Sequence, residues 1–69
     1  MDHQMSEDAY SWQNDRQNWF DDTINNIDCK AILIDGVNIL PKYKADPMLL
    51  PAHHKIENDA YRQSRMKCL

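Results

Sequence analysis

The sequence of 69 residues contains a single glycine, and this shortage excludes one class of site. Loops that bind phosphate groups need several glycines, because their backbone approaches the ligand closely and adopts positive φ angles. Leucine, isoleucine, valine and phenylalanine together number 13, about 19% of the chain, which is low for a domain with its own core. We therefore expect one small domain over residues 1–69, with a thin core and no large enclosed pocket.

Motifs of catalysis and metal binding are also missing. Cys29 and Cys68 lie far apart, and the chain has neither a Cys-x-x-Cys pair nor a His-Glu-x-x-His motif. His53 and His54 precede Glu57, but a metal site needs three or four converging ligands. We interpret the two histidines as part of a polar, titratable helix start, with metal stabilisation of a small domain as the alternative. We expect no enzymatic activity, no cofactor and no metal ligands.

Long apolar runs are absent as well. Ala31–Ile34 and Met48–Leu50 are the longest aliphatic runs, and both are far shorter than the roughly 20 residues of a membrane-spanning helix. The N-terminus lacks the basic and apolar regions of a signal peptide. These observations predict a soluble, cytoplasmic protein with no membrane partner. In that compartment we expect Cys29 and Cys68 to be free thiols, and a disulfide between them is the alternative.

The N-terminal third contains an amphipathic pattern. We interpret residues 1–5 as a loose tail and Ser6 as a helix N-cap. From there to Asn26 the chain has neither glycine nor proline. Apolar side chains recur on one side of this helix: Ala9, Trp12, Trp19, Phe20, Ile24 and Ile27. The pattern predicts a helix over residues 6–26.

Two runs rich in β-branched and other apolar residues follow. They cover residues 29–34 and 37–41, and an Asp-Gly pair separates them. Asp-Gly between such runs is typical of a tight β-hairpin turn. We predict a β-hairpin over residues 29–41, with the positive φ of the turn at Gly36.

The C-terminal part contains the signals of another helix. Asp46 before Pro47 is typical of an N-cap followed by a first-turn proline, and Pro51 is expected to change the helix direction. We predict a kinked helical segment over residues 46–67. With the first helix and the hairpin, this gives an α+β fold, in which the N-terminal helix covers one face of the hairpin.

The second face of the predicted hairpin carries Leu33 and Leu40. A lone hairpin is marginal in water and exposes both of its edges. We therefore expect these two leucines to serve self-association, and the protein to be a homodimer or part of a complex with a larger protein.

Charge is divided unevenly along the chain. Residues 1–28 have seven acidic and one basic residue, a net charge of −6, whereas residues 29–69 have a net charge of +3. In the first helix, aspartates and tryptophans each recur at intervals of seven residues. We predict that one strip binds a protein partner with a basic surface, and it consists of Trp12, Asp15, Trp19 and Asp22. The alternative is that both tryptophans are core residues beside a solvated acidic flank.

The basic C-terminal half supports a second hypothesis. A small nucleic-acid-binding regulator would use bases on the last helix to contact phosphates, and these are Lys55, Arg62, Arg65 and Lys67. The chain as a whole is acidic, with 11 acidic against 8 basic residues. We therefore rank nucleic-acid binding as the alternative to protein binding.

In size, acidity and lack of catalytic motifs, the chain resembles small accessory proteins of phages and other mobile elements. Such proteins often bind and modulate one host or competitor protein. The resemblance is one of type, and it implies a non-enzymatic protein that regulates or inhibits a protein partner by occupying its surface.

Overall fold

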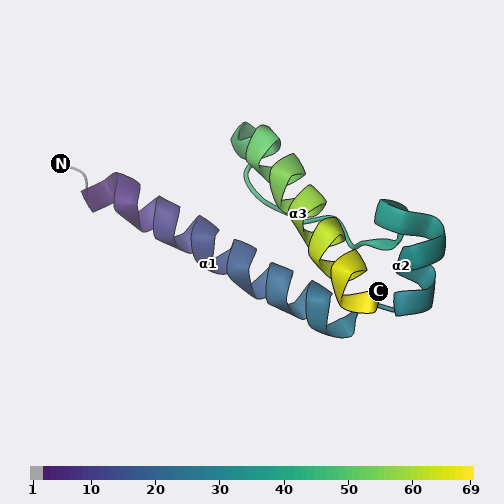
Figure 1. Ribbon diagram of the computed structural model, residues 1–69. Helices are drawn as coiled ribbons and strands as arrows, with labels where there is room; N and C mark the ends of the chain where they lie inside the picture. Colours follow the sequence, from purple (N-terminus) through teal and green to yellow (C-terminus); the bar gives the residue numbers. More distant parts are fainter. Residues whose placement is uncertain (1–2) are drawn as a thin grey trace.

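The computed structural model describes the backbone of residues 3–69 and the side chains of residues 12–69. Within that part, three α-helices and two 3-10 helices follow in the order α1 (His3–Asn26), α2 (Cys29–Asp35), η1 (Gly36–Ile39), η2 (Pro47–Leu49) and α3 (Leu50–Cys68). Residues 3–69 contain no β-strand (Figure 1). The predicted α+β fold is therefore wrong, and the described chain is helical.

The segment predicted as a hairpin, residues 29–41, forms α2 and η1 instead. Asp28 caps the start of α2, because its Oδ1 atom accepts hydrogen bonds from two backbone N–H groups of the first turn, at 3.0 and 3.3 Å. Gly36 ends the helix with a φ of +68°, and its N–H group donates to the carbonyl oxygen of Ile32. The positive φ predicted at Gly36 is confirmed, but it serves a helix end rather than a hairpin turn. A short apolar run is compatible with a strand and with a buried helix, and here the two caps decide for the helix.

The first helix, α1, is the one that the apolar spacing predicted over residues 6–26. It ends at Asn26, as that pattern indicated, and it begins at His3, so residues 3–5 of the expected tail belong to it. Residues 1–2 and the side chain of Ser6, the expected N-cap, lie outside the described residues.

The C-terminal helical segment begins with a capped turn. The carboxylate of Asp46 accepts a hydrogen bond from the N–H group of Met48 at 3.0 Å, and Pro47 occupies the first turn of η2, as predicted. Pro51 lies in the first turn of α3, where its missing N–H group costs little. One face of α3 is buried, and it consists of His53, Ile56, Ala60 and Ser64.

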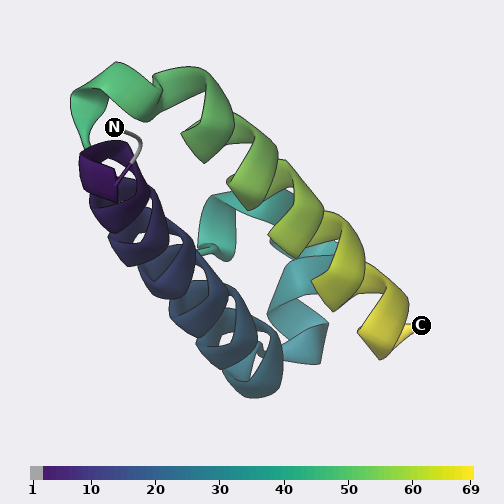
Figure 2. The same cartoon turned by 90° about the vertical axis from the view of Figure 1, so that its left-hand side faces the viewer.

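The third helix is the element on which the other helices pack. Within the described part of the chain, α1 and α2 each pack against α3 rather than against one another. Figures 1 and 2 show α1 and α3 running in the same general direction, with α2 beside the C-terminal half of α3. The centre of the core is formed by Ile32, Leu40 and Ala60. Ala60 is fully buried, and its small side chain allows the backbones of α2 and α3 to come close.

A disulfide joins the first residue of α2 to the last residue of α3. It links Cys29 to Cys68, whose Cα atoms are 5.2 Å apart, across a sequence separation of 39 residues. The expectation of two free thiols is therefore wrong. The bond became possible because residues 29–35 are helical, which places the start of α2 beside the C-terminal end of α3.

Candidate functional site

The four residues predicted to bind a partner divide into two groups on α1. Asp15 and Asp22 are exposed, whereas Trp12 and Trp19 are half-buried. The Trp19 ring packs on Tyr43 with centroids 5.3 Å apart, and the Arg16 guanidinium lies 5.5 Å from the centre of the Trp12 ring. Both tryptophans therefore contribute to packing, and the aspartates are the most exposed side chains of this strip.

Tyr43 is the buried residue against which the Trp19 ring packs. It is only 5% exposed, and it lies in the connector between η1 and η2. Its hydroxyl donates a hydrogen bond to the backbone oxygen of Trp12 at 3.3 Å, and its N–H group donates to Oε2 of Glu57 at 3.1 Å. Burial raises the pKa of the Tyr43 phenol above its ordinary value; Asp15 adds to the rise and Arg16 opposes it. Tyr43 therefore connects α1 to α3 from within the interior.

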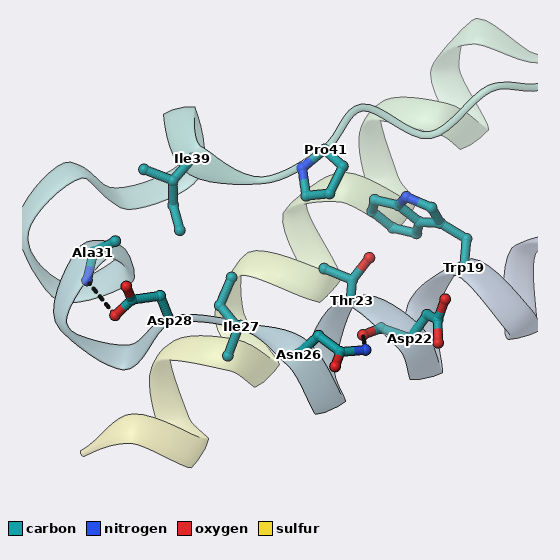
Figure 3. A pocket seen from close by; sticks show the side chains of 9 residues that line it. All are labelled: Trp19, Asp22, Thr23, Asn26, Ile27, Asp28, Ala31, Ile39 and Pro41. Carbon is teal, nitrogen blue, oxygen red and sulfur yellow. Dashed lines mark hydrogen bonds between the residues drawn. The ribbon is translucent and has the colours of Figure 1, made fainter.

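An open groove of about 600 Å³ lies between the C-terminal half of α1 and the unit formed by α2 and η1 (Figure 3). One wall follows the last two turns of α1 from Trp19 to Asn26 and continues to Ile27, and Ile39 and Pro41 form the wall opposite. The groove exists because α1 and α2 are both supported by α3 and do not pack against each other. Among the residues whose side chains the structure describes, the groove is lined by Trp19, Asp22, Thr23, Asn26, Ile27, Asp28, Ala31, Ile39 and Pro41.

The groove combines apolar walls with negative charge. Its charged lining residues in the described part of the chain are Asp22 and Asp28, and that part contributes no lysine or arginine to the lining. One oxygen of Asp28 already caps α2, whereas the side chain of Asp22 is exposed. The arrangement suits a ligand that carries an apolar group and a positive charge close together.

The two leucines predicted for self-association have different environments. Leu40 is 3% exposed and belongs to the core, so it offers no surface to a second chain. Leu33 is 42% exposed on α2, and Ile34 beside it is 77% exposed. The hairpin edges that motivated this prediction are absent from residues 3–69, and Leu33 is what is left of the proposed contact.

The basic residues of the alternative hypothesis lie on α3 and are exposed. Two of them are engaged within the molecule. The Lys67 ammonium donates to the backbone oxygen of Ile24 at 2.8 Å, and the Arg65 guanidinium donates to the Tyr61 hydroxyl at 3.1 Å. Lys55 and Arg62 complete the set.

The two histidines occupy opposite environments. His54 is exposed, whereas His53 is buried and meets the edge of the Tyr43 ring at a centroid distance of 5.2 Å. Its Nε2 atom has no hydrogen-bond partner among the described residues. The interpretation of both as a polar helix start is therefore wrong for His53. The described part of the chain brings together no group of three or more histidine, cysteine, aspartate or glutamate side chains that could hold a metal ion.

Most of the groove was missed by reasoning from the sequence. Of its lining, Trp19 and Asp22 belong to the predicted strip, whereas Thr23, Ala31, Ile39 and Pro41 do not. Asp28 was the signal that could have indicated a helix over residues 29–35, because an aspartate before an apolar run is also a helix N-cap pattern. The burial of His53 could have been predicted from its spacing to Ile56 and Ala60, which places all three residues on one helical face.

Comparison with protein-family models finds no match, and comparisons with curated proteins and with solved structures find none either. Across the described residues, no helix combines the length and the apolar character needed to cross a membrane.

Proposed function

We propose that this protein is a non-enzymatic interaction protein that binds a protein partner with a basic surface and regulates or inhibits it by occupying that surface. The observation that carries the proposal is the groove beside α1, in which apolar walls are combined with two carboxylates and, among side chains of residues 12–69, with no basic lining residue. Asp15, one turn before Trp19 and exposed, extends the negative surface along α1. Such a surface steers basic partners and excludes acidic ones.

The type of protein follows from the same features. A small regulator of the kind found in phages and other mobile elements needs a stable docking surface rather than a catalytic centre. The nucleic-acid alternative remains a prediction that no specific contact favours, because Lys67 and Arg65 already bond within the molecule. Self-association remains a prediction that now depends on Leu33 and its exposed neighbour Ile34.

The compartment is the part of the hypothesis that changes most. A cytoplasmic location was predicted from the sequence. The Cys29–Cys68 disulfide argues against it, because such bonds persist in oxidising compartments and are rare in the cytosol. We therefore favour an oxidising environment for the working form of the protein.

The test is quantitative affinity capture with the disulfide-bonded protein as bait. We expect the Asp15→Lys, Asp22→Lys double variant to capture about tenfold less of a basic partner, because two attractive charges become repulsive. The double variant Asp21→Lys, Asp35→Lys is the matched control, since it reverses the same number of charges and both aspartates are exposed and lie outside the groove lining. Trp19→Ala is unsuitable, because Trp19 packs on Tyr43.

Equal capture by the double variant and the control would remove the acidic face of α1 from the binding surface. Absence of any basic protein from the captured material would overturn the proposed function itself. Circular dichroism of each variant establishes beforehand that it is folded.

A further inference from the structure

The groove has a defined width, because both of its walls are held in place by the rest of the fold. Its two walls belong to segments that meet only through α3 and the Ile27–Asp28 junction. The position of α2 is held at two points: Ile32 is buried in the core with Ala60, and the disulfide fixes Cys29 to the end of α3. The wall that contains Ala31 is therefore held at a set distance from α1.

The lining determines which chemistry fits the groove. The apolar contribution comes from Trp19, Ile27, Ala31, Ile39 and Pro41. Asp22 and Asp28 contribute negative charge on the side of α1 and its junction with α2. Figure 3 shows Ile39 and Pro41 across the space from Thr23 and Ile27, with Asp28 at the Ala31 end and Asp22 near Trp19. An apolar group in the groove therefore has a carboxylate toward each end.

We propose that the groove binds an extended segment of a partner protein that presents an aliphatic side chain next to a lysine or arginine. This inference rests on the proposed function and specifies the ligand. The groove is open to solvent, whereas small-molecule sites enclose most of the surface of their ligand. A peptide segment places its side chain between the walls and leaves the rest of the chain outside. Charge complementarity to Asp22 and Asp28 then requires a basic neighbour.

A second copy of the chain is the competing occupant. The protein itself carries an exposed apolar side chain next to basic residues, because Met66 is 74% exposed and lies between Arg65 and Lys67. In this chain, however, Arg65 bonds to Tyr61 and Lys67 bonds to Ile24. Binding of both bases in a neighbouring groove would have to break these two hydrogen bonds, which favours a different protein as the occupant.

The experiment is an NMR titration of the isotope-labelled, disulfide-bonded protein with defined peptides. The probe is a blocked seven-residue peptide with a central leucine and a lysine on each side. One comparison peptide has glutamates in place of the lysines, and another has alanine in place of the leucine. We expect saturable shifts at Thr23, Ile27, Ala31 and Ile39 with the probe, and at least about fivefold weaker binding of both comparison peptides.

The matched variants are Asp22→Lys and Asp21→Lys. Both aspartates are exposed neighbours on α1, but only Asp22 lines the groove. We expect Asp22→Lys to weaken probe binding by about tenfold and Asp21→Lys by less than about threefold, because the more distant charge is screened by solvent and salt.

Absence of binding, equal weakening by the two variants, or shifts spread over all of α1 would each overturn the groove assignment. A dimer in sedimentation that Asp22→Lys dissociates would overturn it in favour of a second copy. None of these results bears on the affinity capture described above, which tests whether a basic partner exists. A captured basic partner that leaves the groove resonances unshifted would retain the proposed function and refute this site.

Discussion

At the scale of single residues, Tyr43 is a buried side chain with partners on two helices. It contacts the Trp19 and His53 rings and bonds to Trp12 and Glu57, so one side chain and its own N–H group connect two helices. It does so from a connector that has no regular structure. A buried hydroxyl with a partner rigidifies the packing around it, because breaking the bond would leave a polar atom without water.

We predict that Tyr43→Phe lowers the free energy of unfolding at neutral pH by about 1 kcal/mol, since the bond to the Trp12 oxygen is lost. The raised pKa of Tyr43 sets the pH dependence of this difference. Its stabilising effect is complete below the unfolded pKa of about 10 and is lost as the pH rises through the higher folded value.

Urea denaturation of both proteins from pH 7 to pH 11 provides the measurement, because Tyr10 and Tyr61 are common to both and their effects cancel. A stability difference between the two proteins that grows with pH would contradict the prediction.

At the scale of elements, α2 shows how short capping signals decide the conformation of an ambiguous segment. A seven-residue helix is unstable alone, and its apolar run has no helical period of its own. Asp28 and Gly36 satisfy backbone groups at its two ends. The burial of Ile32 against α3 and the disulfide then hold it in place.

Gly36 allows a direct test of this account. Its φ of +68° and ψ of −142° lie where L residues are strained, and the nearest neighbour of an added Cβ would be the Tyr61 ring, at an ordinary 3.6 Å. We predict that Gly36→Ala lowers the unfolding free energy by about 1–3 kcal/mol through backbone strain. Chemical denaturation measures the change.

A synthetic chain with D-alanine at position 36 is the control, because a D residue favours positive φ. It should be at least as stable as the glycine protein. A neutral or stabilising L-alanine would show that Gly36 does not hold this conformation in solution.

At the scale of the whole molecule, the disulfide compensates for a thin core. A domain of this size obtains only about 3–5 kcal/mol from its apolar core. Closing a loop of about 40 residues contributes about 4 kcal/mol in the chain-entropy model, and the Cys29–Cys68 bond has a sequence separation of 39. The two contributions are therefore comparable, and neither alone gives a comfortable margin.

We predict that reduction, or the double variant Cys29→Ser, Cys68→Ser, lowers the unfolding free energy by about 2–4 kcal/mol and loosens the groove wall on α2. Thermal and chemical denaturation with and without reductant measure the first effect. Hydrogen exchange at Ala31 measures the second. A loss below about 1 kcal/mol with unchanged exchange would show that packing alone holds α2.

The sequence alone determined the features that depend on near neighbours. The apolar period and the lack of glycine and proline gave the helix that ends at Asn26, and Asp46 with Pro47 marked the next helical start. The only glycine indicated where φ would be positive. Tertiary structure decided whether residues 29–35 became strand or helix, which side chains line the groove, and that the two cysteines meet. These outcomes depend on contacts between residues distant in sequence: Ile32 with Ala60, Tyr43 with Trp19 and Cys29 with Cys68. No local pattern contains such contacts, because their energy exists only once the segments are packed together.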